Sequence, residues 1–283
     1  MQIKKILCKS AMGKCGFPSG GLAINPYVGC HHGCVYCYAR FMKRFTGHAE
    51  DWGDFVDVKS NIVDILKKQL ESSKYLNENI FIGTVTDPYQ PVEKDYELTR
   101  GILKVLSNYD NPVSILTKSD RIIRDIALLK KIRNIDINFT INTLDEKWRE
   151  LTEPNASTIK QRFGAIGKLA KEDISVSVMM GPYWPIFTNP TDLFREFKRV
   201  GVNRVFTESL NTIGGNWTGV EKVLKSSYPS ILSEMRTTLL NENNFNGFYA
   251  EAKNKTEKAS REYGIPVTIY FGLGHAGKFK QTK

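Results

Sequence analysis

Short apolar runs alternate with amphipathic stretches along most of the chain. Six of these runs are rich in β-branched residues and have the length of buried strands. We predict strands at Gly21–Asn25, Ile80–Val85, Val113–Thr117, Ile137–Asn142, Ser175–Met180 and Arg204–Thr207. Their spacing is typical of successive βα units, so we expect them to form one parallel sheet.

Helical periodicity lies between the predicted strands. Apolar residues recur there at intervals of three and four positions, which predicts helices at Val58–Ser72, Tyr96–Asn108, Arg121–Ile132, Ile159–Lys171 and Thr191–Val200. We expect Asp120 to cap the third of these helices, and Asn189 followed by Pro190 to begin the fifth. Six βα units predict an α/β protein that forms a partial or closed barrel of parallel strands.

The regular alternation of predicted strands and helices ends at about residue 212. A long helical stretch is expected from Val220 to Leu240, a polar turn over Asn241–Asn246, a helix over Tyr249–Tyr263 and a last strand at Ile265–Tyr270. The sequence shows neither an internal repeat nor a linker rich in Pro, Gly and Ser. We therefore expect a barrel over residues 1–212, and a helical extension over residues 213–283 packed on the same domain.

Composition and charge narrow the class of protein. The 283 residues are 41% hydrophobic and 25% charged, as in ordinary soluble globular proteins. No apolar run approaches the roughly 18 residues of a membrane span, and the first residues are too short an apolar stretch for a signal peptide. We expect a cytoplasmic protein with no membrane partner. The net charge of +10 permits an anionic partner, and residues 1–50 hold seven Lys and Arg against the single Glu50.

All five cysteines lie within the first 37 residues, at Cys8, Cys15, Cys30, Cys34 and Cys37. An odd, clustered set without an export signal indicates metal or redox chemistry rather than disulfides. The last three have the spacing CX3CX2C directly after the first predicted strand. Thiolates on one short loop can bind three irons of a 4Fe-4S cluster and leave the fourth iron for a small molecule.

Structural zinc is the alternative for these three cysteines, with His31, His32 or His48 as a fourth ligand. Structural zinc sites usually combine two pairs of ligands from separate turns. The sequence holds no second CXXC pair and no HX3H pair. The spacing therefore favours the cluster.

Several segments in the correct order resemble the radical S-adenosylmethionine (radical SAM) superfamily, in its spore photoproduct lyase-like, DNA repair photolyase-type branch. The resemblance spans roughly residues 3 to 210. Besides the cysteine loop, it rests on Gly83–Lys94 at the second strand, Leu116–Ser119 at the third, and Thr143–Glu146, Glu153–Ala156 and Arg162 in the fourth unit.

The resemblance implies a partial (β/α)6 TIM-type barrel whose open top holds a 4Fe-4S cluster and S-adenosylmethionine. One electron passed through the cluster would cleave a C–S bond of the cofactor, and the resulting 5′-deoxyadenosyl radical would abstract hydrogen from a substrate. The electron would come from a donor protein of the flavodoxin or ferredoxin type. The substrate stays open between a nucleic acid, a peptide and a small metabolite, and a non-enzymatic zinc or iron-sulfur module is the remaining hypothesis.

Site residues follow from the same resemblance. The ligands of the cluster would be Cys30, Cys34 and Cys37. Tyr36 would lie against adenine, or pack under the loop. Thr84 and Thr86 alternate with Val85, so their hydroxyls would share one strand face and bind the methionine amino group. Asp87 would be a further polar contact or the cap of the turn at Pro88.

Further cofactor contacts are implied at the ends of later strands. Lys118 would pair with the cofactor carboxylate, and Arg162 is the alternative partner through its bidentate fork. Asn142 would contact the ribose hydroxyls. Glu208 would face adenine or substrate, or begin a loop. His275 would reach the barrel mouth or lie on the surface, and no catalytic residue is assigned.

One position departs from the family pattern. Spore photoproduct lyase returns a hydrogen atom from a cysteine, whereas the matching segment carries Thr84 and no cysteine follows Cys37. This argues against thymine-dimer repair by the same relay. Cys8 or Cys15 would substitute only if the N-terminal arm folds back over the barrel mouth.

Overall fold

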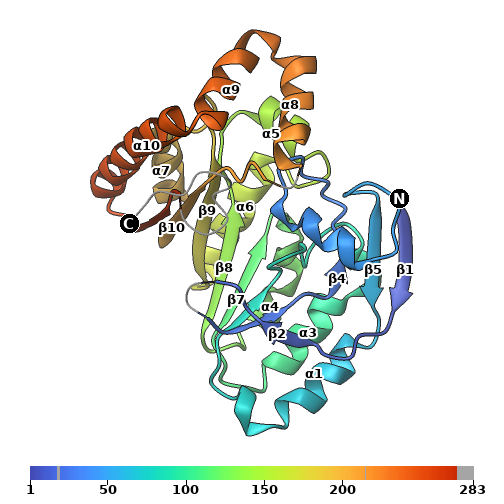
Figure 1. The fold of residues 1–283 in the computed structure, drawn as a ribbon. Helices are drawn as coiled ribbons and strands as arrows, with labels where there is room; N and C mark the ends of the chain where they lie inside the picture. The colour runs from blue at the N-terminus through green and yellow to red at the C-terminus, as the bar shows by residue number, and fades with distance from the viewer. Residues whose placement is uncertain (18–19, 214, 273–283) are drawn as a thin grey trace.

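The computed structural model describes residues 1–17, 20–213 and 215–272. Its main sheet has eight strands in the order β11-β10-β9-β8-β7-β6-β3-β2 (Figure 1). Among the described strands of this sheet, only the β2–β3 pairing is antiparallel. The strands are β2 (Met12–Lys14), β3 (Leu22–Ile24), β6 (Ile80–Ile82), β7 (Val113–Thr117), β8 (Ile135–Thr140), β9 (Ser175–Tyr183), β10 (Arg204–Ser209) and β11 (Val267–Tyr270).

Helices connect these parallel strands, as crossover connections require. They are α1 (Ile62–Leu70), α2 (Glu93–Tyr96), α3 (Leu98–Leu106), α4 (Ile126–Leu129), α5 (Glu146–Thr152), α6 (Ile159–Lys171) and α7 (Pro190–Val200), with 3-10 helices η2 (Ser73–Tyr75) and η3 (Asp120–Asp125). The six predicted strands are therefore present in one open sheet, and the predicted partial barrel is confirmed. The last predicted strand, β11, adds a further parallel strand beside β10.

Local sequence signals explain why some predicted helix boundaries agree with the observed ones. The helix predicted over Ile159–Lys171 is observed with the same bounds because Thr158 and Gln161 form a capping box. Asn189 caps α7, and Pro190 is its first residue, as predicted. The cap predicted at Asp120 is wrong, since Ser119 accepts the hydrogen bond from the Arg121 amide at 3.3 Å.

A second, smaller sheet was not predicted. It has the order β1-β5-β4, with β1 (Gln2–Ile6), β5 (Phe55–Lys59) and β4 (Tyr27–Val28). The helix predicted from Val58 begins only at Ile62, because Val58 belongs to β5 and is fully buried between the other two strands. Other predicted strand ends are also wrong: β3, β6 and β8 end earlier than predicted, at Ile24, Ile82 and Thr140, whereas β9 and β10 extend further, to Tyr183 and Ser209.

The C-terminal part is more helical than predicted. The stretch expected from Val220 to Leu240 divides into α8 (Asn216–Ser227), η4 (Pro229–Ile231) and α9 (Leu232–Leu240). Proline at the start of η4 lacks an amide hydrogen, so it separates the helices. The polar turn expected over Asn241–Asn246 is wrong, because α10 (Glu242–Tyr263) begins there with Asn241 as its cap.

This C-terminal part shares the core of the barrel. Helix α10 packs against α7, and the buried side chains of α8, α9 and α10 belong to the same hydrophobic cluster as the strands. The boundary at residue 212 stays a prediction. No helix in the described part of the chain is long and apolar enough to cross a membrane.

Candidate active site

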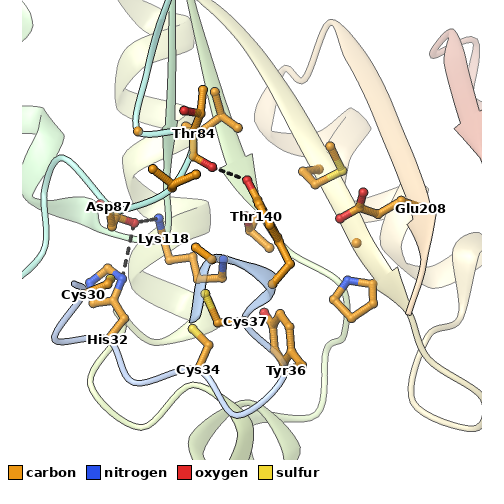
Figure 2. A pocket seen from close by; sticks show the side chains of 18 of the residues that line it. Cys30, His32, Cys34, Tyr36, Cys37, Thr84, Asp87, Lys118, Thr140 and Glu208 are labelled. Atoms are coloured by element: carbon orange, nitrogen blue, oxygen red, sulfur yellow. Dashed lines mark hydrogen bonds and ion pairs between the residues drawn. The ribbon is translucent and has the colours of Figure 1, made fainter. Parts of the chain in front are cut away.

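A pocket lies at the carboxyl ends of the parallel strands, where barrel enzymes place their reactive groups (Figure 2). Its wall combines the loop before η1 (Tyr38–Phe45) with the ends of β6 to β10. The residues that line it include Phe17, Cys30, His32, Cys34, Tyr36, Cys37, Tyr38, Ala39, Gly83, Thr84, Thr86, Asp87, Lys118, Thr140, Gly181, Glu208 and Leu210. The structure thus brings together residues from seven separate segments of the sequence.

The three cysteines of the loop point into this pocket (Figure 2). Gly29 has φ +86°, and a Cβ there would collide with the Phe55 carbonyl oxygen, so the loop turns where only glycine fits. The Val35 amide donates to the Thr152 carbonyl at 3.0 Å and fixes the loop to α5. Burial raises the pKa of the Cys34 and Cys37 thiols, so binding of iron there must release protons.

Tyr36, between two of these cysteines, is anchored by a buried ion pair. Its hydroxyl donates to Glu153, which also pairs with Arg162. Arg162 donates in addition to the Thr140 carbonyl and the Ser157 carbonyl, each at 2.9 Å. Arg162 is 1% exposed and does not line the pocket. Its guanidinium N–H groups therefore bind groups inside the protein. No role was predicted for Glu153, although it lies in a segment that carries the family resemblance.

Glu153 stays ionised in this environment. Burial alone would raise the pKa of its carboxyl, but the charges of Arg162 and Lys118 outweigh burial and hold the pKa below its usual value. The Tyr36 hydroxyl donates to the same carboxylate. The Tyr36 ring beside the cysteines is therefore anchored through its hydroxyl group. It packs against Trp184 in a T-shaped arrangement, with a centroid distance of 5.3 Å. Trp184 itself is fully buried, as expected for a core residue.

Asp87 uses both carboxylate oxygens inside the protein. One accepts from the Tyr89 amide and from the Thr117 hydroxyl, each at 2.8 Å. The other accepts from the Lys118 amide at 2.7 Å and lies 3.3 Å from the His32 ring. Asp87 therefore caps its turn and joins the cysteine loop to the end of β7.

Thr84 and Thr86 do not lie on a strand face, because β6 has ended two residues earlier at Ile82. The Thr86 hydroxyl donates to the Gly29 carbonyl at 2.6 Å, which supports the cysteine loop. The Thr84 hydroxyl accepts from the Asn25 amide group at 3.0 Å. Both residues nevertheless line the pocket.

Lys118, directly after β7, and Glu208, on β10, both face the pocket (Figure 2). Within the described residues, neither charged group has an ion-pair partner within 4.0 Å. Burial lowers the pKa of Lys118, but the nearby Cys34 and Glu153 outweigh it, so the net shift is upward. Burial raises the pKa of Glu208 to about 7, and Lys118 opposes that shift.

Some predicted site residues lie elsewhere. Asn142 is buried two residues beyond β8 and donates to the Gly181 carbonyl at 3.2 Å, and Thr140 lines the pocket instead. His275 falls outside the described residues. The N-terminal arm does fold back far enough for Phe17 to line the pocket, whereas neither Cys8 nor Cys15 is among the residues that line it.

Comparisons with known proteins agree with this geometry. The family model described as the Radical SAM superfamily matches residues 24–188. An uncharacterized protein of Methanocaldococcus jannaschii is 35% identical over 185 residues, which are 65% of this chain and 69% of that protein. A protein of Pseudomonas phage M6 named Radical SAM Nalpha-GlyT isomerase is 25% identical over 204 residues, 70% of this chain and 41% of that protein.

A solved structure shows the same fold. A spore photoproduct lyase mutant with bound AdoMet and a dinucleoside spore photoproduct aligns with a TM-score of 0.70, covering 94% of this chain and 81% of that chain at 15% identity. The partial barrel, the cysteine loop at its mouth and the family model agree. The chain belongs to the radical SAM superfamily and is a radical SAM enzyme whose substrate is unidentified.

Proposed function

We propose that Cys30, Cys34 and Cys37 hold a 4Fe-4S cluster and that the pocket beside them binds S-adenosylmethionine. The observation that carries this proposal is that three thiols and the ammonium group of Lys118 line one pocket at the barrel mouth. Among the described residues, no carboxylate oxygen lies within 4.0 Å of that ammonium group. When bound, the two groups would supply a 5′-deoxyadenosyl radical by reductive cleavage of a C–S bond. That radical would abstract hydrogen from a substrate in the same pocket.

The donor set suits a cluster better than a single zinc ion. Among the residues that the structure describes, no three His, Cys, Asp or Glu side chains converge on one metal position. In a cluster each thiolate binds a different iron, so the sulfurs need to surround a larger body. Gly29 and Gly33 have positive φ angles and leave room for the loop to curve around it.

The side chains around the cysteines divide into two groups. The Lys118 ammonium lies 5.8 Å from the Tyr36 ring centroid and would pair with the carboxylate of the methionine moiety. Tyr36 is anchored where its ring can support adenine. Thr84 and Thr86 line the pocket and would contact the amino group. Asp87, Asn142 and Arg162 are engaged inside the protein, so we assign them to positioning these neighbours.

The hydrogen-atom relay of spore photoproduct lyase has no counterpart among the pocket cysteines. Once Cys30, Cys34 and Cys37 bind iron, no other cysteine remains among the described lining residues. We therefore propose chemistry other than thymine-dimer repair by a cysteine relay. The substrate class stays open between nucleic acid, peptide and metabolite, and Glu208 would face either adenine or that substrate.

Anaerobic reconstitution with iron and sulfide, followed by dithionite and S-adenosylmethionine, tests the proposal. We expect a brown protein with about four irons that forms 5′-deoxyadenosine. Cys30→Ala should lose both the cluster absorbance and the product, while the matched variant Cys8→Ala keeps both. A colourless protein that holds one zinc, or an iron-loaded protein that forms no 5′-deoxyadenosine, would contradict it.

Lys118→Ala separates cofactor binding from cluster assembly. It should keep its iron and bind S-adenosylmethionine roughly 10 to 100 times more weakly, since a hydrogen bond to a charged group contributes about 1.5–3 kcal/mol. The measurement is equilibrium dialysis of the reconstituted protein, with the exposed Lys131→Ala as the control. Unchanged affinity would remove Lys118 from the cofactor site.

A further inference from the structure

A basic and aromatic surface lies directly beyond the last cysteine of the loop. Helix η1 begins after Cys37, and its first residues, Tyr38 and Ala39, line the pocket. The residues that follow turn away from the pocket. We call Phe41, Lys43, Arg44 and Phe45 the η1 surface; the two phenylalanines are 40% and 66% exposed.

The charges of the η1 surface are not neutralised by neighbouring carboxylates. In the described ranges neither Lys43 nor Arg44 has an acidic group within 4.0 Å, and the Lys43 ammonium donates to the Ala49 carbonyl at 3.0 Å. The Arg44 guanidinium lies 5.5 Å from the Phe41 ring centroid and 4.6 Å from that of Phe45. Exposed arginine and aromatic residues are enriched where proteins bind other proteins.

The same helix is coupled to the cysteine loop. The Arg40 guanidinium donates to the Val35 carbonyl at 2.9 Å and to the Cys37 carbonyl at 3.3 Å. The same Val35 carbonyl oxygen lies against α8 at Gly219, where an added Cβ would collide with it. Helices η1 and α8 therefore cover this part of the loop, and only residues 38–40 separate the η1 surface from Cys37 along the chain.

The position of this surface distinguishes an electron donor from a substrate. A substrate must enter the pocket to meet the radical, but none of the four η1-surface residues lines that pocket. Arg44 lies over one face of each ring, so only the opposite faces are left for a nucleic-acid base to stack on. A donor protein needs only to come close to the cluster from outside, because it delivers an electron and no atom.

We propose that the η1 surface docks an acidic electron-donor protein of the flavodoxin or ferredoxin type. The inference rests on the proposed cluster at Cys30, Cys34 and Cys37. In the step served by this docking the donor loses one electron and the cluster gains it, and no bond forms or breaks. Complementary charge accelerates the encounter and makes it sensitive to salt, as is usual for transient redox partners.

The test compares two sources of electrons for 5′-deoxyadenosine formation by the reconstituted enzyme. One is a reduced flavodoxin, regenerated by its reductase and NADPH, and the other is dithionite, which needs no docking surface. Lys43→Glu/Arg44→Glu should slow the flavodoxin-driven reaction at least about tenfold and leave the dithionite-driven reaction unchanged. The flavodoxin-driven rate of the unaltered enzyme should also fall as salt rises from about 50 to 300 mM.

Lys131→Glu/Arg133→Glu is the matched control. It makes the same change of charge on exposed residues before β8, at the end of the barrel opposite to the pocket. The milder Lys43→Gln/Arg44→Gln variant should give an intermediate flavodoxin-driven rate, and iron content reports whether each variant has folded.

Three results would overturn the inference in different ways. Equal flavodoxin-driven rates for the η1 variant and the control would show that the donor docks elsewhere. If the η1 variant instead loses affinity for a fluorescent single-stranded oligonucleotide while its flavodoxin-driven rate is normal, the surface binds nucleic acid. If the unaltered, iron-loaded enzyme forms no 5′-deoxyadenosine even with dithionite, the proposed function itself fails.

Discussion

Glu208 differs from the other carboxylates around the pocket in its hydrogen-bond and ion-pair partners. Asp87 accepts hydrogen bonds from two backbone amides and a hydroxyl, and the pKa of its carboxyl is lowered because these donors and His32 outweigh burial. Glu153 is paired with Arg162. Glu208 has no such support within the described chain, and burial raises its pKa from an ordinary 4.5 to about 7.

The sign of the pH effect follows from that shift. Between about pH 4.5 and 7 the folded protein keeps a proton on Glu208 that the unfolded chain releases, so the free energy of unfolding falls as pH rises through this window. Glu208→Gln removes the titration. We expect the variant to gain stability relative to the unaltered protein, by roughly 1–3 kcal/mol between pH 5 and 8.

Urea unfolding of the reduced apoprotein at several pH values measures this difference. The comparison must use the same protein preparation with and without the substitution, so that all other titrating groups cancel. A difference that stays constant from pH 5 to 8 would show that the pocket does not hold a protonated Glu208.

A local signal can fix the bounds of a predicted element. Helix α6 is an example, because its capping box lies within four residues. Strand β5 was missed because its burial depends on β1 and β4, which come from distant parts of the chain. Periodicity within one window does not show such a partner.

In the candidate site, too, contacts between residues that are distant in the sequence could not be predicted. The cysteine loop and Lys118 were predicted from short motifs, and both lie in the pocket. Arg162 was the alternative to Lys118 as partner of the cofactor carboxylate, but it pairs with the buried Glu153, and that pairing joins residues on either side of a turn. The sequence identifies residue types suited to the chemistry, while the fold decides which donors remain free.

The conformation of the turn after β6 depends on one glycine. Gly83 has φ +90°, and a Cβ there would lie 2.5 Å from Pro88 Cδ and 2.8 Å from the Leu116 carbonyl oxygen. Gly83→Ala should therefore lower the free energy of unfolding by about 2–5 kcal/mol, from backbone strain and overpacking together. Guanidinium unfolding of the apoprotein measures the loss.

Gly164→Ala is the control for this substitution. Gly164 lies inside α6 with no atom within 4 Å of an added Cβ, so alanine should stabilise the protein by about 0.5–1 kcal/mol. If both variants change stability by the same amount, the close approach around Gly83 does not determine this turn.

At the scale of the molecule, the C-terminal extension completes the sheet and the core. Strand β11 covers the edge of β10, and α10 packs against α7. Tyr249 of α10 also reaches the pocket side of the barrel, since its hydroxyl donates to the Tyr183 carbonyl and accepts from the Leu210 amide, each at 3.0 Å. The extension therefore supports the loop that follows β10.

Truncation after residue 212 tests whether the extension belongs to the same folding unit. The cut would expose β10 as an unpaired edge and uncover the apolar side chains of α7, both of which favour aggregation. We expect the truncated chain to be aggregated or to have lost cooperative unfolding, as measured by size-exclusion chromatography and circular dichroism. A chain that ends at residue 272 keeps every described element and should remain monomeric if the full chain is. A soluble truncated protein with a sharp unfolding transition would show instead that residues 1–212 fold alone and that the extension is a separate unit.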